Sequence, residues 1–230
     1  MSALTDAPRP LAILDFDIEN RPLTYWVPDR PTAQITSIAW MWVGQHDSLD
    51  CRLLAPPCYH KGHEEHCPDW PAGMVSERQM LLDFAEVIGR ADIVTGHYIL
   101  RHDLPIVNGA MYDNALPLLD DIRASDTKLH MFTKADLPAS QEHLLELLGT
   151  TCPIGTTLEK FHMTQVKWRE ANKLTRAGVE LTRRRVMSDV HAHSHMREDM
   201  LARGWLSAPT IWRSGGDEVI EGRLTTGEQK

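Results

Sequence analysis

The stretch LAILDFDIE, residues 11–19, combines an apolar run with acidic residues toward its end. Such a run predicts a buried strand. Because side chains two positions apart in a strand share a face, Asp17 and Glu19 project together, and Asp15 lies on the same alternation. Two carboxylates on one face of a core strand repel each other unless a divalent cation lies between them. The alternative is an ordinary acidic end of a strand, and the D-x-E pattern alone leaves both interpretations open.

Outward from this strand, the hydrophobic pattern predicts further strands, then helices alternating with strands, and finally a long helix. The other predicted strands are residues 35–44, 50–56, 91–97 and 116–122. The predicted helices are residues 76–90, 100–114, 140–149 and 178–203. The first three strands are expected to form an antiparallel meander. This order of elements predicts an α/β fold in which helices are layered on a sheet.

The length of 230 residues suits one domain, or one domain with an appendage. We expect a flexible N-terminus at residues 1–10 and a single domain over residues 11–206. That domain has a loop insertion at about residues 56–73, which are rich in Pro, Gly, Cys and His. A polar C-terminal tail is expected over residues 207–230.

The composition points to a globular protein of the cytoplasm. Apolar residues make up 42 % of the chain, no apolar run reaches the length of a membrane span, and no signal peptide is recognisable at the N-terminus. The four cysteines are too few and too unevenly placed for a disulfide framework. We therefore expect a cytoplasmic location and no membrane partner.

Two further acidic motifs follow the first. Gly96-His97 ends the strand predicted at 91–97, and a turn leads to Asp103-Leu-Pro. The third is Asp189, which lies inside the long helix predicted near the C-terminus. Each has an alternative interpretation, because an Asp before Leu-Pro commonly begins a helix and an Asp in mid-helix is usually solvated.

In this order, the three motifs resemble those of the DnaQ-like (DEDD) 3′→5′ exonucleases, in the ribonuclease-H-like superfamily, over most of the chain. The stretch SDTK, residues 125–128, is similar to the family's segment between the second and third motifs. The resemblance implies a mixed sheet, an antiparallel meander followed by parallel strands, flanked by helices. It makes Asp17 and Glu19 the acids of the first motif, Asp103 that of the second and Asp189 that of the third.

Phosphodiester hydrolysis suits these residue types. Two metal ions about 4 Å apart activate water, neutralise the phosphate and assist the leaving oxygen. Mg²⁺ and Mn²⁺ prefer carboxylate oxygens, so we expect two such ions as cofactors. Asp17 is expected to bridge both, Glu19 and Asp189 to hold the ion that generates hydroxide, and Asp103 to hold the leaving-group ion through waters.

One departure from the family concerns the general base. The family places a Tyr or His four or five residues before the last acid, where this chain has Arg185 and Arg184. Neither guanidinium accepts a proton at working pH. His193, one turn after the third-motif acid, is a candidate base, and the alternative is a surface histidine. In another arrangement, Asp199 is the third acid with His195 four residues before it. Because the expected base is missing, a slow or inactive enzyme is a further alternative.

A loop rich in histidine and cysteine is a candidate zinc site. The potential ligands are Cys58, His60, His63, His66 and Cys67. Tetrahedral Zn²⁺ takes such ligands, but the paired spacing of zinc modules is missing. One interpretation is a structural zinc ion that holds the loop insertion in a fixed conformation, and the other is a surface loop with solvated histidines.

The distribution of charge predicts where nucleic acid lies. The chain has 24 Lys and Arg against 32 Asp and Glu, a formal charge of −8. Residues 160–213 hold eleven basic and five acidic residues, which leaves +6 there and −14 elsewhere. Such a division suits a metal-binding site beside a track for phosphates. The residues expected to contact nucleic acid are Lys167, Trp168, Arg169, Arg183 and Arg185. The alternative for Trp168 is a place in the core, and the alternative for Arg183 and Arg185 is the outer face of a helix. Tyr98 either lines the nucleotide pocket or belongs to the core.

We therefore expect a divalent-metal-dependent 3′→5′ exonuclease that acts on single-stranded DNA ends. RNA is the nearest rival substrate. A nuclease-like module that binds nucleic acid without cleaving it is the second hypothesis, and a zinc-binding adaptor is the third. Since the sequence contains no polymerase domain, a proofreading role requires a separate polymerase or replication protein as partner.

Overall fold

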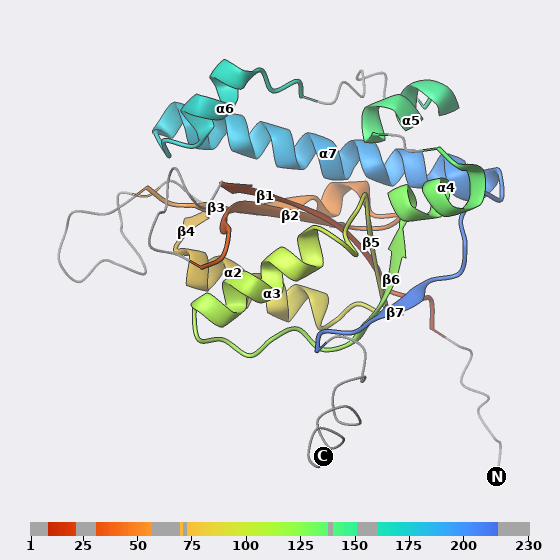
Figure 1. Cartoon of the computed structure of the whole chain (residues 1–230), viewed down its shortest axis with the longest axis horizontal. Coiled ribbons are helices and arrows are strands. Elements are labelled where there is room, and N and C mark those ends of the chain that lie inside the picture. Colours follow the sequence, from red (N-terminus) through yellow and green to blue (C-terminus); the bar gives the residue numbers. More distant parts are fainter. Residues whose placement is uncertain are drawn as a thin grey trace, which may run out of the picture.

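A seven-stranded sheet with strand order β4-β3-β2-β1-β5-β6-β7 runs through the protein (Figure 1). The computed structural model describes residues 9–21, 31–56, 70, 73–137, 140–150 and 161–215. The strands are β1 (Ile13–Arg21), β2 (Gln34–Trp42), β3 (Asp50–Leu54), β4 (Met74–Val75), β5 (Ile93–Gly96), β6 (Ile122–Asp126) and β7 (Thr210–Trp212). The helices are η1 (His46–Ser48), α2 (Glu77–Ile88), α3 (Asp103–Asp113), α4 (Thr127–Ala135), α5 (Gln141–Leu148), α6 (Gln165–Ala171) and α7 (Arg176–Ala202).

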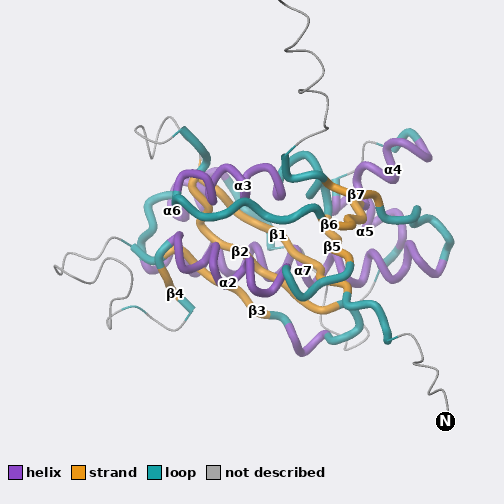
Figure 2. The backbone as a smooth tube through the Cα atoms, turned by 90° about the horizontal axis from the view of Figure 1, so that it is seen from below, coloured by secondary structure: helices purple, strands orange, loops and turns teal. Residues whose placement is uncertain are grey.

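The sheet is mixed, as the sequence predicts. β1, β2 and β3 form an antiparallel meander. β5 and β6 then extend the other side of β1 in parallel. Figure 2 shows β1 and β2 next to each other at the centre of the sheet. The acidic strand that opens the fold is therefore the central one.

The two faces of β1 meet different layers. Leu14, Phe16 and Ile18 are fully or almost fully buried in the main core, where the Phe16 ring lies 5.1 Å from that of Phe84 in α2. The alternate residues of the strand face α7, which lies across the opposite face of the sheet (Figure 1). The period-2 pattern thus directs the acids of β1 to the face that α7 covers.

The structure differs from the predicted elements at one strand and at two helices. The strand expected at 116–122 begins only at Ile122 and runs to Asp126. Its polar residues Ser125 and Asp126 are buried, which hydrophobicity alone does not anticipate. Helices α4 and α6 were not expected, although Asp126 and Thr164 provide N-caps for them.

The domain boundary expected at residue 206 is also too early. β7 lies within the stretch expected to be a polar tail, yet it pairs antiparallel with β6 and so belongs to the sheet. Residues 216–230 and most of the insertion expected at about 56–73 lie outside the described residues. Within the described ranges, no helix combines the length and apolar character needed to cross a bilayer.

Gly96 ends β5 where the chain passes very close to β1. A Cβ atom at this position would lie 2.3 Å from Cγ2 of Ile99 and 2.8 Å from the carbonyl oxygen of Phe16. We expect Gly96→Ala to lower the free energy of unfolding by about 1–3 kcal/mol, because backbone must shift to accept the methyl group. Urea denaturation measures this, with Gly215→Ala, whose Cβ would meet nothing within 4 Å, as the control. Equal stability of the two variants would contradict the prediction.

Candidate functional site

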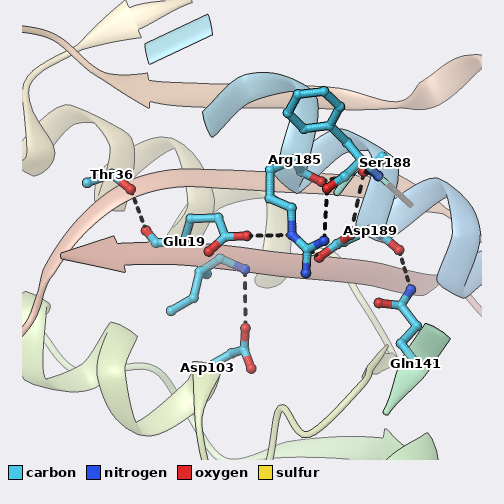
Figure 3. Close-up of polar contacts among 9 residues, drawn as sticks. Glu19, Thr36, Asp103, Gln141, Arg185, Ser188 and Asp189 are labelled. Atoms are coloured by element: carbon cyan, nitrogen blue, oxygen red, sulfur yellow. Dashed lines mark hydrogen bonds and ion pairs between the residues drawn. The ribbon is translucent and has the colours of Figure 1, made fainter. Parts of the chain in front are cut away.

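Asp103, the acid expected in the second motif, is held against β1 beyond the point where β5 stops pairing with β1. β5 pairs with β1 only alongside Ile13–Asp15. Beyond that point the backbone N–H of Ile18 donates to Oδ1 of Asp103, at 3.2 Å (Figure 3). Asp103 is the first residue of α3 and is only 2 % exposed. The helix start therefore delivers a carboxylate to the backbone between Asp17 and Glu19.

The first-motif and third-motif acids converge on one point. Asp17 and Glu19 come from β1 and Asp189 from α7, and one ligand atom of each lies within 4.8 Å of the others. Figure 3 shows Glu19 and Asp189 facing each other across the gap between strand and helix, with Asp103 on the other side of β1. We call Asp17, Glu19, Asp103 and Asp189 the acid cluster.

A guanidinium group lies inside this cluster. Nε of Arg185 is 2.9 Å from Oδ2 of Asp189 and 3.3 Å from Oε1 of Glu19, and Nη1 donates to the carbonyl of Phe161 at 3.1 Å. The side chain is 18 % exposed. Arg185 was expected to contact nucleic acid, but the structure pairs it with two of the acids. Its position one turn before Asp189 is a sequence signal for this ion pair.

The electrostatics of the cluster favour a further cation. Burial, followed by repulsion from Asp189, raises the pKa of Glu19 to about 8, although Arg185 opposes this shift. Repulsion between the carboxylates therefore persists in the presence of one guanidinium. Carboxylate oxygens that converge in this way are a donor set that suits Mg²⁺ or Mn²⁺. The residues therefore fit the predicted metal ions.

Two side chains that sequence reasoning missed hold the helix segment around Asp189. Nε2 of Gln141, in the first turn of α5, donates to the backbone oxygen of Asp189 at 2.7 Å. Oγ of Ser188 accepts the N–H of Phe161 at 3.0 Å and donates to the carbonyl of Arg185 at 2.8 Å. The bonds from Gln141 to Asp189 and from Phe161 to Ser188 follow no short sequence motif, since each joins segments far apart in the chain.

His193, expected as a candidate general base, has a different environment. Its Nδ1 lies 2.7 Å from Oδ2 of Asp15, and its Nε2 lies 3.0 Å from Oγ1 of Thr127. The imidazole is 2 % exposed and Asp15 is 0 % exposed. Both ring nitrogens are occupied by groups outside the acid cluster. His193 is therefore placed to hold α7 against β1 and the start of α4, and the alternative of a surface histidine is equally excluded.

The arrangement with Asp199 as third acid does not match the geometry. Oδ2 of Asp199 accepts a hydrogen bond from Oγ1 of Thr150 at 2.6 Å, and the residue is not in the acid cluster. His195 lies beside Glu198 instead. Asp189 is the α7 acid that meets the acids of β1.

The SDTK stretch performs a structural task. Asp126 accepts N–H groups from Tyr98 at 3.1 Å, Leu100 at 3.0 Å and Leu129 at 3.0 Å. It thereby ties the turn after β5 to the start of α4. Tyr98 has a φ of 80° in this turn, and Nζ of Lys128 lies 4.2 Å from the centre of its ring. The carboxylate of Asp126 thus orders the loop that leads to Asp103.

His102 brings a basic group to the outer side of the site. Its Nδ1 lies 3.4 Å from Oδ2 of Asp103, and its side chain is 45 % exposed. The hydrogen bond with Asp103 raises the pKa of His102 above its usual value. No role is predicted from the sequence for His102, which directly precedes Asp103, or for Lys128, the last residue of the SDTK stretch.

The remaining basic residues expected to bind nucleic acid are only partly available. Arg183 is paired with Glu180 through two contacts of 2.8 and 2.6 Å. Lys167 donates to the carbonyl of His162, Trp168 is half-buried, and Arg169 is exposed. The Cys58–Cys67 loop expected to bind zinc lies outside the described residues.

Comparison with known proteins identifies the fold. No family model matches the chain, and no curated protein matches it. Among solved structures, a family B DNA polymerase from the hyperthermophilic archaeon Pyrobaculum calidifontis is similar, with a TM-score of 0.59 and 15 % sequence identity. The match covers 84 % of this chain and 25 % of the polymerase, so the chain spans about a quarter of that protein's length. The mixed seven-stranded sheet with its flanking helices is a ribonuclease-H-like fold, as predicted.

Proposed function

We propose that this protein is a divalent-metal-dependent nuclease that removes nucleotides from the 3′ end of single-stranded DNA. The observation that carries the proposal is the convergence of Asp17, Glu19 and Asp189, whose ligand atoms lie within 4.8 Å of one another on a ribonuclease-H-like sheet. Asp103, bonded to the β1 backbone, adds the fourth acid. The fold's likeness to part of a DNA polymerase supports a role on nucleic acid.

Asp17, Glu19 and Asp189 are the residues that would hold the metal ions, with Asp103 on the adjoining side. Bound Mg²⁺ or Mn²⁺ supplies the Lewis acidity and the activated water that phosphodiester hydrolysis needs. The chain itself orients these acids. Gln141 and Ser188 hold the α7 segment, and Asp126 holds the loop that precedes Asp103.

The substrate is proposed to approach beside Phe161. Two cations lie over its ring, with Cζ of Arg184 at 4.2 Å and Nζ of Lys167 at 4.4 Å from its centre. The carbonyl of Phe161 accepts from Arg185, so this group adjoins the acid cluster. An aromatic ring flanked by cations stacks a base while the charges bind phosphates. His102, on the other side, adds a basic group beside Asp103.

The assay that tests this function uses 5′-labelled single-stranded DNA and RNA of one sequence, with Mg²⁺, Mn²⁺ or EDTA. A ladder of products that shorten from the 3′ end, and that disappears with EDTA, supports the proposal. A circular single strand should remain intact, since it has no end. The relative rates on DNA and RNA identify the substrate. Binding without any shortening in either metal would reject the nuclease.

Arg185 favours a second candidate function, a module that binds nucleic acid without cleaving it. Its guanidinium occupies the space between Glu19 and Asp189 and replaces the family's general base. A cation there competes with a metal ion for the same oxygens.

We expect Arg185→Gln to bind Mn²⁺ about tenfold more tightly than the natural chain, because a positive charge a few ångströms from the ion is removed. Titration calorimetry measures the affinity, with Arg183→Gln, which removes an exposed guanidinium on the same helix, as control. If hydrolysis also appears only in Arg185→Gln, the binding module is the natural function. Weaker Mn²⁺ binding in Arg185→Gln would show that the guanidinium supports the ions.

A further inference from the structure

A second group of potential metal ligands lies on the same face of the sheet, at the opposite end of β1 from Glu19. His46 comes from η1, directly after β2, whereas His195 and Glu198 lie on α7 three residues apart. Since β1 and β2 are antiparallel, with Leu14 opposite Trp42, the turn that holds His46 adjoins the start of β1. Along α7, six residues or about 9 Å separate His195 from Asp189. The buried Asp15–His193 pair stands between the two groups.

We propose that His46, His195 and Glu198 form a binding site for a transition-metal ion of the zinc type. One ligand atom from each residue lies within 4.8 Å of the others. Nε2 of His46 is 3.4 Å from Oε1 of Glu198, and Nδ1 of His195 is 3.6 Å from Oε2. Two imidazoles and one carboxylate are ligands that select Zn²⁺ over Mg²⁺.

The distances between these groups suit a shared ion better than direct hydrogen bonds. A hydrogen bond between a ring nitrogen and a carboxylate has a length of about 2.7–3.2 Å, and both contacts are longer. In tetrahedral coordination with zinc–nitrogen bonds of 2.0–2.1 Å, neighbouring ligand atoms stand about 3.3 Å apart. The observed separations of 3.4 and 3.6 Å are close to that value.

The surroundings also suit a metal ion. The rings of His46 and His195 are stacked with centres 4.6 Å apart, and His191 meets His195 edge-on at 4.9 Å. The side chains of His46 and Glu198 are 35 % and 41 % exposed, which leaves an open side for a water ligand. A bound ion would join the β2–β3 connection to α7.

Zinc titration of the full chain tests this site. Protein stripped with a chelator is titrated with Zn²⁺ against a chromophoric competitor, in saturating Mg²⁺ so that the acid cluster does not contribute. His46→Ala and Glu198→Gln should each lower the affinity for one equivalent of zinc by about 100-fold or more. Loss of a residue that only hydrogen-bonds to a ligand costs about 10- to 100-fold in affinity, and loss of the ligand itself costs more. The double variant should bind one equivalent fewer than the natural chain. His143→Ala and Glu142→Gln, exposed residues of α5, are the matched controls.

Cobalt provides an independent readout. Co²⁺ at this site should give the visible absorption of a four-coordinate ion without the sulfur charge-transfer band of a cysteine ligand, and both variants should lose it. Unchanged zinc affinity in the double variant would overturn the proposal. So would loss of all bound zinc in Cys58→Ser/Cys67→Ser, which would assign the ion to the cysteine loop. Thermal unfolding without zinc checks that each variant is folded. No ligand of this site belongs to the acid cluster, so the result is independent of the proposed nuclease.

Discussion

Asp17→Asn is expected to slow the release of nucleotides from a single-stranded 3′ end by about 1,000-fold or more. Loss of one preorganised electrostatic partner already costs about 10²–10³-fold in many active sites, and Asp17 is the acid expected to serve both metal ions. The substitution keeps the shape of the side chain and removes its charge. Initial rates with 5′-labelled DNA in Mg²⁺ and in Mn²⁺ measure the effect.

The matched control for this variant is Asp120→Asn, which makes the same change at an exposed position before β6. It should retain the full rate. Because Asp17 lies among repelling carboxylates, Asp17→Asn should be at least as stable as the natural chain in urea. A variant that is folded and still cleaves at the natural rate would remove Asp17 from the proposed mechanism. Equal loss of activity in Asp120→Asn would show that the assay reports something other than the acid cluster.

His193→Leu is expected to lower the free energy of unfolding by about 3–5 kcal/mol, because it leaves the Asp15 carboxylate buried without its partner. Asp15 is 0 % exposed, and burial raises its pKa while the neighbouring His193 opposes that shift. Urea denaturation measures the loss. His143→Leu, at an exposed position of α5, makes the same change with little effect.

The double variant Asp15→Leu/His193→Leu shows whether the two residues act as a pair. It should lose less stability than the sum of the two single variants, since no unpaired charge remains in the core. Additive losses would mean that Asp15 and His193 are not coupled. If His193 instead acts on the substrate, His193→Gln would retain stability and lose activity, which would contradict the structural role.

Within the acid cluster, the alternation of β1 predicts that Asp17 and Glu19 share a face, and the structure pairs β1 as that alternation requires. Asp103 and Asp189 are assigned to the site only through the resemblance to the DEDD exonucleases, since neither strand nor helix spacing alone selects them. His193 shows where reasoning from helical spacing fails. Four residues along a helix is one turn and also about 6 Å of rise, so His193 meets Asp15 rather than Asp17.

The parts that the sequence did not predict depend on hydrogen bonds between distant segments. β6 contains the buried polar residue Asp126, which is tolerated there because its carboxylate accepts three backbone N–H groups. A hydrophobic pattern does not reveal a strand of this kind. The apolar stretch before it, with Pro117, forms the connection instead. Likewise, Arg185 resembles a phosphate contact in the sequence. Its spacing to Asp189 is a signal for one ion pair, and only the structure shows the second, with Glu19 of β1.

One helix, α7, carries Asp189 of the acid cluster and its partner Arg185, the buried His193, and two of the three proposed zinc ligands. Each residue added to or removed from a helix turns everything beyond it by 100°. A single deletion between Asp189 and His195 would therefore put one of these groups out of reach of its partners on the sheet. Substitutions can accumulate along α7, but changes in its length cannot, and a relative with the same chemistry should keep the same number of residues over this span.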